Sequence, residues 1–249
     1  MQRSLPTYFT TTSLSLHTVN YRQLPYDPAF LPHVLPLLST ARLQRMRDVL
    51  LQRTRYITMI TEKAIDAQNI SAVIRTCECV GLQELHVIEP DGNMKLSRFI
   101  AKGSHQWMDV QHYAAPDNTI SNAVASLKKR GYKIAATTLH DEAVSPEQLP
   151  LDTPIAIVMG SEHCGVSSET LDLADLFVKI PIHGFTESYN LSVASAVLAY
   201  TLTQRLRSSD LPWQLQAADS AEQYYRWVLS SIRNVELHWK KYQAGFKLS

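Results

Sequence analysis

Short apolar runs alternate with amphipathic stretches along most of the chain, and the two patterns predict different elements. Apolar runs rich in β-branched side chains predict strands at 56–65, 84–90, 109–113, 132–139, 154–160 and 176–182. Apolar residues at helical spacing predict helices at 39–52, 69–81, 118–131, 167–176, 190–207 and 221–242. Alternating strands and helices are typical of a parallel sheet, and wholly apolar strands are typical of burial on both faces. The pattern therefore predicts an α/β fold with helices on both faces of one parallel sheet.

The ends of these elements predict how the chain is organised. Asn69 is expected to cap the helix that it begins, and Gly81 to follow its last turn. The prolines spread over the first forty or so residues exclude a long helix there and predict an extended lead-in. We expect three parts: an N-terminal extension with a basic helix (1–55), an α/β domain (56–207), and a linker with a C-terminal helix (208–249).

Composition narrows the class of protein. The chain has 249 residues, of which 45% are hydrophobic and 19% charged, which is a poor match to disorder, collagen or a coiled coil. Its 24 Lys and Arg against 23 Asp and Glu leave a net charge of +1, so any nucleic-acid binding must depend on local patches. No apolar run reaches a membrane span, and the polar N-terminus lacks the apolar core of a signal peptide. The odd cysteine count favours a reducing, cytoplasmic location.

Several common sites are excluded by the motifs that the chain lacks. No G-x-G occurs, so the dinucleotide fingerprint is absent. Neither an H-E-x-x-H nor a pair of C-x-x-C motifs occurs, and the nine histidines are scattered, so we expect no metal site. The glycines at 160 and 165 have P-loop spacing, but Val166 stands where that motif needs lysine.

Three predicted strands are followed by polar segments, where open α/β sheets bind ligands. The first segment has Ser71 and Arg75 on one helical face, and that arginine is suited to a phosphate; a surface arginine is the alternative. The second has a glycine-bounded loop around Glu162, suited to a cationic or hydroxyl-bearing ligand; a tight turn with a solvated carboxylate is the alternative. The third places Ser188 and Asn190 at a helix N-terminus, which binds anions; an ordinary cap is the alternative.

The helix that follows the third segment carries small residues on one side. They allow very close packing, and we expect them to form a contact with a second copy of the chain; packing only against the chain's own sheet is the alternative. These residues are Ala194, Ser195, Ala196 and Ala199.

The segments NISAVIRT, VMGSEHCGVS and IPIHGFTESYNLSVASA, in this order, resemble the motifs of the SpoU/TrmH family of RNA ribose 2′-O-methyltransferases. The preceding ARLQRMRDVLLQRTRYITMITEKAIDAQN resembles the TrmH branch, whose members methylate a guanosine in the D-loop of tRNA. The likeness covers about residues 39–207. It implies S-adenosylmethionine as methyl donor, a homodimer, and the trefoil knot of the SPOUT class in the C-terminal part of the sheet.

The resemblance also implies roles for single residues. The positions that match the family's catalytic site are Asn69, Arg75, Glu162, Ser188 and Asn190. Those that match its donor site are Thr138, Leu139, Gly160, Ile180, Ile182 and Tyr189. Tyr189 departs from the leucine common in the family, and Thr138 stands at a variable position.

Family accounts make the arginine at position 75 the base, but a guanidinium is a poor proton acceptor. We expect Arg75 instead to hold an RNA phosphate and to stabilise the developing alkoxide, with the phosphate or water taking the proton.

Local charge indicates where RNA would lie. Residues 42–55 carry five arginines and one aspartate, and we expect Arg42, Arg45 and Arg47 to contact RNA. Residues 221–249 have a net charge of +3 and several aromatic residues, which either contact RNA or pack in the core. The alternatives are an rRNA methyltransferase of the same family, for which the lead-in is too short to be the usual extra domain, a non-catalytic RNA-binding homologue, and a generic nucleotide-binding protein.

Overall fold

The computed structural model describes residues 21–89, 103–113, 119–139, 142–161 and 164–246. The chain divides into two compact units. One comprises Arg53–Gln214, and the other joins Met1–Gln52 with Leu215–Ser249. Within the described ranges, every helix is too short or too polar to cross a membrane.

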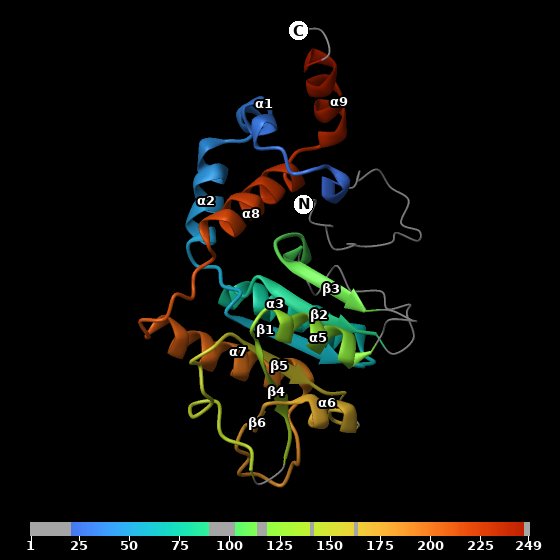
Figure 1. The fold of residues 1–249 in the computed structure, drawn as a ribbon, viewed down its shortest axis with the longest axis vertical. Helices are drawn as coiled ribbons and strands as arrows, with labels where there is room; N and C mark the ends of the chain where they lie inside the picture. Colours follow the sequence, from blue (N-terminus) through green and yellow to red (C-terminus); the bar gives the residue numbers. More distant parts are fainter. Residues whose placement is uncertain (1–20, 90–102, 114–118, 140–141, 162–163, 247–249) are drawn as a thin grey trace. The chain divides into compact units, whose positions relative to one another are not determined.

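The unit Arg53–Gln214 is built on a six-stranded sheet, which Figure 1 shows running from β3 to β6 in the order β3-β2-β1-β5-β4-β6. All five pairings are parallel, as the alternation of elements predicts. The strand order reverses between the central strands β1 and β5. Ligands of open parallel sheets bind at the carboxyl ends of the strands near such a reversal, so we expect the site there. The strands are β1 (Ile57–Glu62), β2 (Glu84–Ile88), β3 (Asp109–Tyr113), β4 (Lys133–Thr137), β5 (Ile155–Met159) and β6 (Leu176–Val178).

Helices cover both faces of the sheet, as predicted. Among its described residues, the helices of this unit are α3 (Ala67–Val80), α5 (Ile120–Lys129), α6 (Ser168–Leu173) and α7 (Leu191–Arg207), with a short 3-10 turn at Ser104–Gln106. Successive strand residues point to opposite faces. Ile57 and Met59 of β1 therefore pack with α3 and α7, whereas Ile60 packs with α5 on the other side. The two resulting cores hold the sheet between two helical layers.

The start of α3 differs from the expectation. Asp66, not Asn69, caps this helix, because the Asp66 carboxylate accepts a hydrogen bond from the backbone N–H of Gln68 at 2.8 Å. Asn69 therefore lies within the first turn. Gly81 follows the last turn with φ of 87°, as predicted. The predicted start of α3 was wrong because Asp66 and Asn69 stand three residues apart and both residue types are good helix caps.

A buried cluster of charges lies at the amino ends of the strands. The Glu84 carboxylate accepts hydrogen bonds from both terminal nitrogens of Arg130, at 2.8 and 2.6 Å. Burial alone would raise the pKa of Glu84, but the nearby His86 and the hydrogen bonds from Arg130 outweigh it and hold this pKa well below its ordinary value. Arg55 lies 3.7 Å from the same Glu84 carboxylate and pairs with Asp109 at 2.5 Å.

Arg53 is the second arginine that the fold removes from the predicted RNA patch. Its side chain is 1% exposed and donates to the carbonyl oxygen of Leu82 at 3.0 Å and to Glu78 at 2.6 Å. Burial lowers the pKa of Arg53, and Glu78 opposes the shift. Arg53 and Arg55 therefore form ion pairs with acidic residues inside their own unit. The three arginines of the preceding helix, Arg42, Arg45 and Arg47, remain as the predicted RNA-binding surface.

The second unit is helical. Its longer helices are α2 (Thr40–Leu50), α8 (Ala217–Ser230) and α9 (Val235–Phe246), and α2 packs along α8 (Figure 1). The lead-in is not extended where it is described, because prolines fit the first positions of short helical turns. Three of these turns have a proline at their first or second position: η2 (Pro28–Phe30), α1 (Leu31–Val34) and η3 (Leu35–Leu37). The turn η1 (Tyr21–Gln23) precedes them and has no proline. The single helix predicted at 221–242 is two helices, separated at Asn234, whose φ is 54°.

The aromatic residues of the C-terminal segment mostly form the core of this unit. Tyr225, Trp227 and Trp239 are buried. The Phe30 and Trp239 rings meet edge to face with centroids 4.9 Å apart. Of the two interpretations left open by the sequence, packing is therefore right for these three residues. Tyr224 is half-buried, and the Arg47 guanidinium lies 5.6 Å from its ring centroid.

Candidate active site

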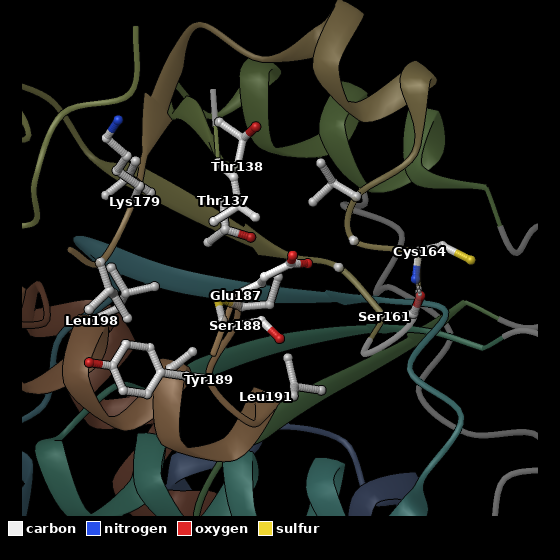
Figure 2. Close-up of a pocket in the computed structure, with 18 of the residues that line it drawn as sticks. Thr137, Thr138, Ser161, Cys164, Lys179, Glu187, Ser188, Tyr189, Leu191 and Leu198 are labelled. Carbon is white, nitrogen blue, oxygen red and sulfur yellow. Dashed lines mark hydrogen bonds between the residues drawn. The ribbon is translucent and has the colours of Figure 1, made fainter. Parts of the chain in front are cut away.

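A pocket of about 730 Å³ opens at the carboxyl ends of β4, β5 and β6, beside the start of α7 (Figure 2). Its walls come from the segments that follow these strands and from the first turns of the helix. The residues that line it are Thr137, Thr138, Leu139, Met159, Gly160, Ser161, Cys164, Gly165, Val166, Leu171, Val178, Lys179, Ile180, Ile182, Glu187, Ser188, Tyr189, Leu191, Ala194 and Leu198. The volume is in the range of pockets for small organic ligands.

The six predicted donor residues all line this one pocket. They come from three stretches of chain that lie far apart in the sequence, and the sheet brings them to the same edge. These residues are Thr138, Leu139, Gly160, Ile180, Ile182 and Tyr189. Their contact with a donor stays a prediction, but the cavity that such contact requires is present.

The glycine-bounded loop after β5 folds back tightly on itself. Ser161 and Gly165 exchange two backbone hydrogen bonds of 3.0 Å, and Gly165 has φ of 66°. A Cβ atom on Gly160 would lie 2.0 Å from the carbonyl carbon of Gly165 and 2.1 Å from the nitrogen of Val166. Glycine is therefore required at position 160. Glu162, the predicted catalytic carboxylate, lies outside the described residues.

The first and third motifs meet beside the pocket. The side-chain amide of Asn190 donates a hydrogen bond to the side-chain oxygen of Asn69 at 3.2 Å, 121 positions apart in the sequence. Asn190 also caps α7, accepting from the backbone N–H of Ser192 at 2.9 Å and from its hydroxyl at 2.6 Å. Because α3 packs against α7, this amide pair is held from both sides.

The other predicted catalytic residues are placed differently. Ser188 lines the pocket, two residues before Asn190. Arg75 lies about 9 Å further along α3 than Asn69. Its side chain is exposed and makes no hydrogen bond or ion pair with another described residue. The structure thus joins Asn69 to Asn190, puts Ser188 at the cavity, and leaves Arg75 facing solvent.

Two charged lining residues were not found by sequence reasoning. Lys179 follows β6 directly, and Glu187 precedes Ser188 within the third motif. Figure 2 shows Glu187 and Ser188 together near the middle of the view, between Thr137 and Leu191. A charged residue directly after a buried strand was the available signal for Lys179, and the motif's polar composition masked Glu187.

Two of the four small residues of α7 that were predicted to contact a second chain are buried inside this chain, whereas Ala194 and Ala196 are half-buried. Ser195 is fully buried and Ala199 is 1% exposed, and Ala199 belongs to the core shared with α3. The alternative, packing against the chain's own core, is right for these two residues. The face of α7 that points outward carries Val193, Val197 and Tyr200, which are 46%, 37% and 60% exposed.

Comparison with known proteins connects this pocket to a family. The sequence model of the SpoU rRNA Methylase family matches residues 56–200. A tRNA (guanosine(18)-2′-O)-methyltransferase of Borreliella burgdorferi is 40% identical over 195 residues, which are 77% of this chain and 88% of that protein. The chain belongs to the SpoU methylase family. The match spans the pocket and all three motifs.

Solved structures of SpoU methylases share the fold. The A. aeolicus TrmH/SpoU tRNA modifying enzyme superposes with a TM-score of 0.68 at 29% identity, over 77% of this chain and 97% of that one. The methyltransferase AviRb of Streptomyces viridochromogenes, in complex with the cofactor AdoMet, has a TM-score of 0.52 at 19% identity, over 65% of this chain and 62% of that one. The second likeness concerns the fold alone.

The tight loop of this SpoU methylase generates a prediction at Gly160. Gly160→Ala should weaken binding of S-adenosylmethionine at least about tenfold and lower the free energy of unfolding by about 3 kcal/mol, because the new methyl group would overlap backbone atoms. Calorimetric titration and denaturant unfolding measure the two effects. Gly184→Ala is the matched control, since nothing lies within 4 Å of its added Cβ. Equal behaviour of the two variants would contradict the prediction.

Proposed function

We propose that this protein transfers a methyl group from S-adenosylmethionine to a ribose 2′-hydroxyl of RNA, at a guanosine in the D-loop of tRNA. The observation that carries the proposal is the convergence of the three motif segments on one pocket and one amide pair, in a chain of this family. The name of the Borreliella burgdorferi relative supports guanosine in tRNA as the target. The rRNA in the family's name makes rRNA the second candidate substrate.

The residues present fit the proposed donor. Leu139, Ile180 and Ile182 offer apolar walls for a nucleoside, and the backbone of the glycine loop lies close to the cavity. Glu187 offers a carboxylate to a donor that carries a sulfonium and an ammonium group. When bound, S-adenosylmethionine would supply an electrophilic methyl group.

Positioning is the main task of the protein in such a reaction, because an in-line attack needs little besides correct geometry. Asn190, held by Asn69 and Ser192, is suited to orient the substrate next to the pocket. Arg75 is suited to bind an RNA phosphate and to stabilise the alkoxide that forms as the hydroxyl loses its proton. Its exposed guanidinium is accessible to a large substrate.

The proposal extends to features that the family resemblance implies: a homodimer, a trefoil knot in the C-terminal part of the sheet, and a cytoplasmic location. The outward stripe of Val193, Val197 and Tyr200 on α7 supports a dimer contact, since exposed apolar residues at i, i+4 and i+7 form a continuous surface. The α7 start also carries Asn190, which would place the contact near the proposed site.

Transfer of a labelled methyl group tests the function. We expect incorporation into bulk tRNA and, after nuclease mapping, a modified guanosine in the D-loop. Arg75→Ala should lower kcat about a hundredfold while donor binding stays unchanged, because the lost interaction forms mainly in the transition state. Lys129→Ala, which removes an exposed charge from α5, is the control. Labelling of rRNA alone would change the substrate, and near-normal turnover of Arg75→Ala would refute its role.

The basic surface of α2 generates a prediction about salt. Arg42, Arg45 and Arg47 are exposed, and we propose that they contact phosphates. Replacing all three with alanine should flatten the slope of log K against log[salt] for tRNA by up to about three. Binding isotherms at several salt concentrations measure the slope, with Lys128→Ala/Lys129→Ala as control. An unchanged slope would place the RNA elsewhere.

The outward stripe of α7 generates a prediction about assembly. Val197→Arg should convert a dimer to monomers, because a dimer would bury the new charge without a partner. Sedimentation velocity measures the state. Ala125→Arg adds the same charge to an exposed position of α5 and should remain dimeric. A monomeric wild-type protein, or a dimeric Val197→Arg variant, would contradict the proposed contact.

A further inference from the structure

A buried carboxylate lies behind the pocket and belongs to none of the three motifs. Glu62 ends β1 and is 3% exposed. One of its carboxylate oxygens accepts the hydroxyl of Ser167 at 2.6 Å. The other accepts the backbone N–H of Ser167 at 3.0 Å and the hydroxyl of Thr170 at 2.8 Å. A buried carboxylate is costly unless it is well hydrogen-bonded, so these three contacts define its position strongly.

The strand alternation explains why Glu62 points this way. Glu62 is two residues beyond Ile60 and therefore faces the same side of the sheet, where α5 and α6 lie. Ser167 caps α6, since its hydroxyl oxygen accepts the backbone N–H of Thr170 at 3.1 Å. The carboxylate thus joins the central strand to the cap of α6, across 105 positions of sequence.

Ser167 directly follows the glycine loop, residues 160–166, whose described members line the pocket. The start of that loop is held by the sheet, because Thr61 of β1 pairs with Met159 of β5. Its end is held by Glu62 through Ser167. Both attachments come from the last two residues of β1, so one strand end determines where the loop begins and where it finishes.

We propose that Glu62 is a positioning residue for the methyl donor. It is not among the residues that line the cavity, and it acts by fixing Ser167, which directly follows the lining residues Gly165 and Val166. The identity of the ligand rests on the proposed function, whereas the effect on the loop does not. Loss of the Glu62 contacts should weaken donor affinity and leave the chemical step nearly unchanged once the donor is saturating.

A purely structural role is the rival explanation, and the sheet offers a matched control for it. Glu84 is also 3% exposed and strongly hydrogen-bonded, but it lies at the amino ends of the strands. Glu84→Gln and Glu62→Gln make the same chemical change in two buried carboxylates. Only the second alters the loop that borders the pocket.

The experiment measures donor affinity, turnover and melting temperature of both variants. For Glu62→Gln we expect a Kd for S-adenosylmethionine about tenfold higher, equivalent to about 1.4 kcal/mol, with kcat at saturating donor within about threefold of wild type. For Glu84→Gln we expect an equal or larger drop in melting temperature, and a donor Kd within about twofold of wild type. A donor Kd unchanged in Glu62→Gln, or raised equally in both variants, would overturn the proposal.

A double-mutant cycle tests whether the effect passes through Ser167. Ser167→Ala should raise the donor Kd, and the combination with Glu62→Gln should raise it by less than the product of the two single effects. Independent, multiplicative effects would refute this route. If Glu62→Gln does not fold, Thr170→Val serves instead, because it removes one hydrogen bond to the same carboxylate. It should raise the Kd for S-adenosylmethionine about threefold, and an unchanged Kd would refute the proposal.

Hydrogen exchange separates this inference from the proposed function. Amide protons of Ser161 and Gly165 should exchange faster in Glu62→Gln than in Glu84→Gln, since both take part in the hydrogen bonds that close the loop. This readout needs no donor. A wild-type protein that fails to bind S-adenosylmethionine contradicts the proposed function alone, whereas unchanged exchange in Glu62→Gln contradicts the role of Glu62.

Discussion

The parallel pairing of β1 with β5 is the contact on which the site depends. It runs from Ile57 with Ile155 to Thr61 with Met159, so both strands end at the same level. From there β1 leads into α3 and Asn69, and β5 leads into the glycine loop. Since α7 packs on α3, Asn190 joins the same edge of the sheet. The register of β1 with β5 brings two distant segments together, and the packing of α7 on α3 adds Asn190, which is 121 positions from Asn69.

Charged residues lie at both ends of the strands, in ion pairs at the amino ends and around the pocket at the carboxyl ends. At the amino ends, the buried carboxylate of Glu84 is paired with Arg55 and Arg130, whose side chains are partly exposed. At the carboxyl ends, two charged residues, Lys179 and Glu187, line the pocket. Breaking the ion pairs of a buried carboxylate is costly, so the pairs around Glu84 stabilise the fold. Partly exposed charges at the pocket can exchange water for substrate at a lower cost in free energy.

The long helix α7 combines three roles on different faces. Its first residues cap it and meet Asn69, its inner face uses small residues to approach α3 closely, and its outer face presents apolar side chains. Ser195 and Ala199 illustrate the inner face, Val193 and Val197 the outer one. The effect of a substitution in α7 on folding, on the site or on assembly therefore depends more on the face where the residue lies than on the residue type introduced.

The alternation of apolar and amphipathic segments predicted the strands and their parallel arrangement, because the hydrophobic pattern is a local property of the chain. The resemblance of the motifs to those of a family implied the six residues that line the pocket. The sequence alone did not determine which arginines are exposed: Arg53 and Arg55 look like Arg45 until the sheet supplies partners. Nor could it show which face of α7 is outward, or that Glu62 meets Ser167, since both depend on contacts between distant segments. The periodicity of a sequence indicates which residues share one face of a helix or strand. What that face contacts depends on how the other elements pack against it.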